Sequence, residues 1–371
     1  MFFLTPITIW SLTYFYAIFY ILLIFSILLY LLPILKDLLN FKYFKNNKSN
    51  DYLTGFDLYW ILLTFLILIL FINLTWTSHS LVSWFGHLVF SSLQKKFLIL
   101  ISVVFFFVLL LYTSSFYVTS RELYDYWLTC LNFYIWTIFL FFSNTIFTVI
   151  FFIEILSTLI LLLLITSVFS TTYFYNNVNT NLNNYFTTTL PNVFLQTLMF
   201  FFWISLISSL NLFFFLIFFY LKFLTFDWYI FEVIFYHLFL IVDVKNTFSI
   251  ALVWFILLFC IFLKCGLVPF YFWKPNFFRG MPFSVLFFYI TFFYFFIFLF
   301  FLLFLLFYLN EIFYFFIFVL TFFLLVGIIF LLAILCEAYY IKIFLAMSSI
   351  LNTLFVFLAL SGVAEFDILF L

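Results

Sequence analysis

The chain has 371 residues, of which 70% are hydrophobic and only 7% are charged. No soluble domain has this balance, so the composition predicts an all-α protein that crosses a membrane many times. The 13 basic and 13 acidic residues cancel, and the net charge therefore gives no support to a nucleic-acid partner. Phenylalanine contributes 73 residues, which indicates the coding bias of an AT-rich genome such as an organellar one.

Hydropathy predicts ten membrane-spanning helices in windows of about 19 residues. They cover residues 8–34, 57–75, 97–117, 127–142, 146–168, 194–220, 247–272, 283–308, 312–335 and 344–361. We expect a single transmembrane domain over 1–371, with four helices at 8–142 and a core at 146–361. The stretch 170–192 is rich in Asn and Thr, and we expect it to form a surface loop.

Basic residues in the connections predict the orientation of the chain. The odd-numbered connections contain eight Lys and Arg residues, Lys274 and Arg279 among them, and the even-numbered ones contain four. By the positive-inside rule, the odd-numbered connections face the matrix or cytoplasm, and the N-terminus lies on the other side.

Two charged residues fall well inside predicted helices. Glu154 lies in the fifth helix and Lys264 in the seventh. A lysine near the middle of a membrane helix costs about 2.5–3.5 kcal/mol on insertion scales, so it needs a partner or a water-filled cavity. We therefore expect the two residues to pair, and such a pair can change protonation when its surroundings change. The alternative is a structural ion pair that only clamps two helices together.

A helix break is predicted directly after Lys264. Pro269 has no N–H to donate to the carbonyl of Cys265, and Gly266 precedes it, so the seventh helix should be discontinuous near 266–269. Polar backbone at membrane depth is tolerated only where it is buried in protein or lines water, so we expect a polar group near the freed carbonyl. The 4 cysteines have no C-x-x-C spacing, and no metal or iron–sulfur site is expected.

The segment 264–282, KCGLVPFYFWKPNFFRGMP, resembles the seventh-helix motif of chain 2 of NADH:ubiquinone oxidoreductase, or respiratory complex I. That motif reads K-x-G-x-x-P-F-H-x-W-x-P-D-x-x-x-G-x-P. The matching residues are Lys264, Gly266, Pro269, Phe270, Trp273, Pro275, Gly280 and Pro282. Tyr271 replaces the usual His, and Asn276 replaces the usual Asp. The stretch around Glu154 and the segment 341–362 resemble the family's fifth-helix and LKRxLAYSS regions, in the same order.

This resemblance implies an antiporter-like bundle in the membrane arm of complex I. It implies that Glu154 and Lys264 carry out proton translocation and that Gly266 and Pro269 break the helix. The chain would be a subunit of an H⁺-translocating enzyme without a redox centre of its own. No cofactor is expected here, because FMN, the iron–sulfur clusters and ubiquinone would belong to other parts of the complex. The implied location is the mitochondrial inner membrane, with lipids and other membrane-arm subunits as partners.

The chain departs from the family at two further lysines. The family has one on helix 8, but residues 285–309 contain none, and Tyr294 lies near its expected place. The family's helix-12 lysine lies beyond the ten helices predicted here, so we expect a separate chain to supply the missing C-terminal helices. Two alternatives stay open, a stand-alone cation/proton antiporter and a complex I subunit kept for its structure after pumping was lost.

Overall fold

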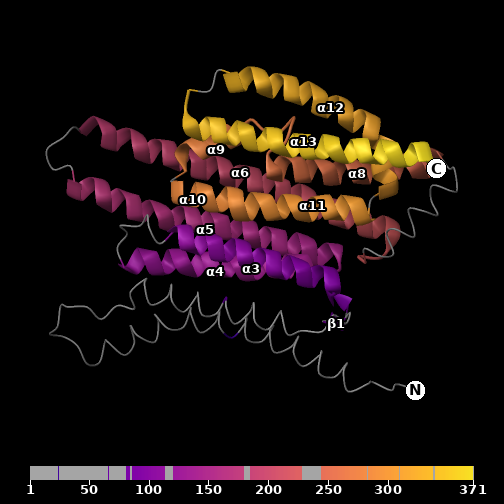
Figure 1. The fold of residues 1–371 in the computed structure, drawn as a ribbon, viewed down its shortest axis with the longest axis horizontal. Coiled ribbons are helices and arrows are strands. Elements are labelled where there is room, and N and C mark those ends of the chain that lie inside the picture. Colours follow the sequence, from indigo (N-terminus) through magenta and orange to yellow (C-terminus); the bar gives the residue numbers. More distant parts are fainter. Residues whose placement is uncertain are drawn as a thin grey trace. The chain divides into compact units, whose positions relative to one another are not determined.

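The computed structural model describes residues 81–83, 86–112, 120–178, 184–227, 244–281, 283–308, 310–336 and 339–370, together with Ile24 and Leu66. The first two predicted helices, 8–34 and 57–75, lie outside the described residues except for Ile24 and Leu66. Most of the described residues are helical (Figure 1).

Residue contacts divide the chain into two compact units. Unit 1 consists of Met1–Asn144 and Thr158–Val178, and unit 2 consists of Thr145–Ser157 and Asn179–Leu371. The boundary runs through the fifth predicted helix. The turns that carry Glu154 therefore belong to the same unit as Lys264.

Unit 1 contains a short hairpin and two packed helices. Strand β1 (Leu81–Ser83) pairs antiparallel with β2 (Leu88–Phe90), a small addition to the expected all-α fold. Helix α3 (Ser92–Tyr112) begins with a capping box, in which Ser91 and Gln94 exchange hydrogen bonds between side chain and backbone. It packs against α4 (Ser120–Phe142), where the ring of Phe105 stacks on that of Tyr134 at 4.6 Å.

Helices α5 (Ile146–Val178) and α6 (Asn184–Phe223) are longer than the sequence predicted. Both continue into the stretch 170–192, so less of it connects the two helices than the Asn- and Thr-rich composition suggested. Helix α5 starts at a threonine pair. The backbone N–H of Thr148 donates to the Thr145 hydroxyl, and the N–H of Thr145 donates to that of Thr148.

The seventh predicted helix, 247–272, covers most of α8 (Val244–Cys265) and the turn at 266–272, and α9 (Trp273–Gly280) follows in what was predicted as a connection. The eighth corresponds to α10 (Phe283–Phe288), the π-helix η2 (Tyr289–Tyr294) and α11 (Phe295–Tyr308) in direct succession. The π-helix has wider turns than an α-helix, and such segments are frequent at functional sites.

The remaining helices of unit 2 surround the α8–α9 turn. Helix α12 (Asn310–Cys336) runs beside α13 (Ile341–Phe370), and α13 also packs against α9 (Figure 1). Helix α6 contacts both α8 and α9. Large aromatic side chains fill the centre, each at most 1% exposed: Trp273, Phe277, Phe278, Phe288, Tyr289 and Phe292.

The helices have the length and composition of membrane spans. Among the described residues, 4 helices are long and apolar enough to cross a bilayer, with spans at Ser92–Leu109, Ile146–Ile165, Phe194–Leu221 and Ile341–Ala359. Shorter apolar stretches occur at Tyr126–Phe142, Phe255–Cys265, Val285–Phe301 and Thr321–Cys336. Many large apolar side chains on these helices are exposed, as suits contact with lipid. The chain is a multi-pass membrane protein, and its predicted total of ten helices stays a prediction.

Candidate functional site

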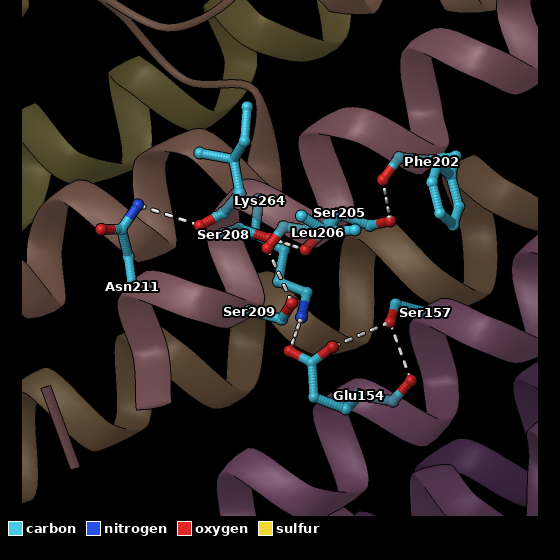
Figure 2. Close-up of polar contacts among 10 residues, drawn as sticks. Glu154, Ser157, Phe202, Ser205, Leu206, Ser208, Ser209, Asn211 and Lys264 are labelled. Atoms are coloured by element: carbon cyan, nitrogen blue, oxygen red, sulfur yellow. Dashed lines mark hydrogen bonds and ion pairs between the residues drawn. The ribbon is translucent and has the colours of Figure 1, made fainter. Parts of the chain in front are cut away.

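Glu154 and Lys264 form an ion pair inside unit 2, with 2.5 Å between Lys264 Nζ and Glu154 Oε1 (Figure 2). The Lys264 side chain is 4% exposed and that of Glu154 is 22% exposed. Charges so far from water lose hydration energy, and their mutual attraction offsets part of that loss. The structure therefore brings together the two charged residues that the sequence singled out.

Two helices position this pair. Glu154 lies in the third turn of α5, beyond the threonine pair that caps the helix. Ser157, one turn further on, donates to the Glu154 carbonyl at 2.7 Å, and its hydroxyl lies 3.4 Å from Glu154 Oε2. Lys264 extends from the last turn of α8, where the negative end of the helix dipole favours a cation.

Helix α6, which packs directly against α8, carries three serine hydroxyls on residues 205–209. Figure 2 draws these side chains together with the ion pair. Ser205, Ser208 and Ser209 each donate to the carbonyl three residues earlier, at 2.8 Å. Their protons are thus used within the helix, while the oxygen lone pairs can still accept a hydrogen bond from water or from an ammonium group.

Helix α8 ends in a Schellman motif built on Gly266. This residue has a φ of +62°, the left-handed conformation that glycine adopts most easily. The N–H of Gly266 donates to the Leu263 carbonyl at 3.4 Å, and the N–H of Leu267 donates to the Phe262 carbonyl at 2.9 Å. The helix ends at Cys265, four residues before Pro269, so Gly266 and not the proline stops it.

Lys274, in the first turn of α9, lies against this helix end. Its side chain is fully buried, although the sequence placed it in an exposed connection. Its Nζ donates to the Cys265 carbonyl at 3.4 Å, which supplies the polar group expected near that oxygen. The same Nζ lies 3.3 Å from the ring centre of Tyr294 and 5.9 Å from that of Phe278.

Tyr294 continues the polar contacts toward α13. Its hydroxyl lies 2.9 Å from Thr353 Oγ1, and that threonine also donates to the Ile350 carbonyl. The buried hydroxyl of Tyr289, five residues earlier in η2, has no hydrogen-bond partner among the described residues. Where the sequence comparison looked for a lysine on the eighth helix, the structure places the lysine of α9 over the ring of Tyr294.

The prediction that Lys274 lies in a solvent-facing connection is wrong because one face of α9, including Lys274, is buried in the protein core. Its neighbours Pro275, Asn276 and Arg279 gave the segment the composition of a connection. A signal was available in Trp273, Phe277 and Phe278, whose spacing places them on one buried face of a short helix. Without Lys274 the odd-numbered connections contain seven basic residues and the even-numbered ones four. The predicted orientation of the chain is therefore unchanged.

Fold and site together define a multi-pass membrane protein with a buried ion pair next to the end of a helix. No family model matches the chain. No curated protein matches it either. Solved structures with a similar fold include chains of two respiratory complexes. A chain of respiratory complex I from Thermus thermophilus, determined with bound aureothin, superposes with a TM-score of 0.61 at 18% identity. A chain of the membrane-bound sulfane sulfur reductase, an archaeal respiratory membrane complex, superposes with a TM-score of 0.64 at 15% identity.

Both similarities extend over most of this chain. Each covers 92% of it, but only 63% of the complex I chain and 64% of the reductase chain. The protein therefore spans somewhat less than two thirds of the length of these neighbours. At such low identity the similarity establishes a shared fold with chains of respiratory membrane complexes.

Proposed function

We propose that this chain is a proton-translocating, antiporter-like subunit in the membrane arm of a complex I-type respiratory enzyme. The observation that carries the proposal is the buried Glu154–Lys264 pair at the end of α8. The fold shared with a chain of respiratory complex I supports it. The subunit performs no redox chemistry itself and passes protons while other subunits transfer electrons from NADH to ubiquinone.

The pair suits this role because one proton has two acceptable positions. With the proton on Lys264 the pair is ionic, and with the proton on Glu154 both groups are neutral. The low-polarity surroundings favour the neutral form, and the short contact favours the ionic one. A change in nearby charge or hydration can therefore shift the proton, as a relay requires.

The finer parts of the proposal follow the resemblance to chain 2. We assign the protein to the mitochondrial inner membrane, with lipids and other membrane-arm subunits as neighbours. We also propose that α8 and α9 are two halves of one broken transmembrane helix. Its break at Gly266 and Pro269 would keep polar backbone next to the proton path.

The test is the Glu154→Gln/Lys264→Met double variant, which removes both charges with little change in volume. In the reconstituted complex, NADH oxidation should continue while fewer protons are moved per NADH than in the wild type. Normal assembly with an undiminished ratio would reduce the pair to a structural clamp. Proton/cation exchange by the isolated chain in vesicles would instead favour the stand-alone antiporter.

A further inference from the structure

Lys274 is a second buried lysine in the same unit, and no carboxylate among the described residues pairs with it. Its Nζ has two polar neighbours, the Cys265 carbonyl and the face of Tyr294. A buried ionisable residue in a membrane protein is expensive to keep and is usually functional. The α8 end is already capped by Gly266 and Leu267, so termination of the helix does not require a lysine here.

The surroundings of Lys274 accommodate both of its protonation states. As a neutral amine it still has N–H groups to donate to the Cys265 carbonyl. As an ammonium it is attracted to the same oxygen and to the π-face of Tyr294. A carbonyl and a ring attract an ammonium group less strongly than a carboxylate does, so neither state is held permanently. The site thus resembles a station for a mobile proton more than a fixed ion pair.

Contacts connect this station to the residue that follows Lys264 on one side and to α13 on the other. Cys265, whose carbonyl Lys274 contacts, directly follows Lys264 in the chain. On the far side, the ring beneath Lys274 belongs to Tyr294, whose hydroxyl contacts Thr353 of α13. The buried Tyr289 hydroxyl in η2 favours water in this region, because unpartnered buried polar groups attract it.

We propose that Lys274 is a second proton-carrying residue, which receives the proton that leaves the Glu154–Lys264 pair. This inference rests on the proposed function and extends it. In the transfer, an N–H bond of the Lys264 ammonium breaks and its proton passes to a water molecule. That water gives a proton to the neutral amine of Lys274, and no electrons are exchanged. Glu154 then stands as a carboxylate beside a neutral Lys264, ready to take up the next proton.

The experiment uses Lys274→Gln in the whole reconstituted complex, with protons moved per NADH as the readout. Glutamine keeps an N–H donor for the Cys265 carbonyl but carries no mobile proton. The matched control is Arg279→Met, which removes an exposed cation from the same helix. The Cζ atom of Arg279 lies 5.1 Å from the ring centre of Tyr340. The Glu154→Gln/Lys264→Met variant provides the reference ratio for a subunit that has stopped pumping.

If Lys274 carries the proton, the Lys274→Gln complex should assemble, and its ratio should fall to that of the Glu154→Gln/Lys264→Met complex. The Arg279→Met complex should keep the wild-type ratio. A wild-type ratio for Lys274→Gln, beside a reduced one for the Glu154–Lys264 variant, would overturn this inference and leave the proposed function standing. Wild-type ratios for both would remove the proposed function itself. Failure of assembly in Lys274→Gln and also in Lys274→Arg would assign the lysine a structural role and equally overturn the inference.

Discussion

The indole N–H of Trp273 donates to the carbonyl of Leu263 at 3.1 Å, so the first residue of α9 caps the last turn of α8. This hydrogen bond joins two helices that are separated in the chain by a tight turn. We expect Trp273→Phe, which keeps a large ring but removes the donor, to destabilise the protein by about 1–2 kcal/mol. The thermal midpoint of the purified protein should fall. Trp203→Phe is the control, because Trp203 is 54% exposed, and a similar fall there would contradict the argument.

Substitution of Gly266 should cost more than substitution of another glycine with a left-handed backbone. An alanine there adopts an unfavourable φ at a cost of about 1–2 kcal/mol, and its Cβ would lie 3.1 Å from Lys274 Cδ and 3.2 Å from the ring of Trp273. Gly86 has a φ of +95° but open space around it, so Gly86→Ala reports the backbone cost alone. Thermal unfolding of both variants should show a larger loss for Gly266→Ala. Equal losses would mean that the Lys274 side chain moves aside freely.

The contact between Tyr294 and Thr353 should be measurable by a double-mutant cycle. Tyr294→Phe keeps the ring beneath Lys274 and removes only the hydroxyl, while Thr353→Val removes the partner. We expect a coupling energy of about 0.5–1.5 kcal/mol, typical of one buried hydrogen bond. The measurement is the unfolding free energy of the two single variants and the double variant. Strictly additive losses would show that the two hydroxyls do not interact.

The Glu154–Lys264 pair should be most sensitive to single changes. Lys264→Met leaves a carboxylate without its cation, and Glu154→Gln leaves a buried ammonium without its anion. Breaking a fully buried pair costs about 3–5 kcal/mol, and we expect less here because Glu154 is 22% exposed. The double variant should recover part of the loss, since no lone charge remains. The measurements are the yield and the thermal midpoint of the purified protein, and a double variant less stable than both single ones would argue against the pair.

Sequence reasoning found the Glu154–Lys264 pair because a charge in an apolar run is conspicuous and costly. The approximate positions of the described helices other than α9 were predicted for the same reason, since apolar composition alone reports them. The end of α8 was placed too far along the chain. The missing N–H of Pro269 is visible in a sequence, but whether Gly266 adopts a left-handed conformation depends on tertiary context.

Burial of Lys274 could not be derived from local composition. It depends on the packing of Trp273 and Phe277 inside unit 2, where the ring of Phe201 from α6 stacks on Phe277 at 4.9 Å. Contacts of this kind join segments far apart in the chain. The lengths of α5 and α6 were underestimated for a related reason, because Asn and Thr lower hydropathy without preventing helix formation.

The π-helix η2 has a geometric effect on everything that follows it. Hydrogen bonds from each residue to the fifth one before it accommodate one more residue in the turn than an α-helix does. Each residue of an α-helix rotates the next by about 100°. The additional residue therefore resets the angular phase of α11 relative to α10, and it brings the rings of Tyr289 and Tyr294 into a stack at 6.5 Å. Removing a single residue from η2 would turn Tyr294 and the whole of α11 about the helix axis, so the length of this segment determines which side chain lies opposite Lys274.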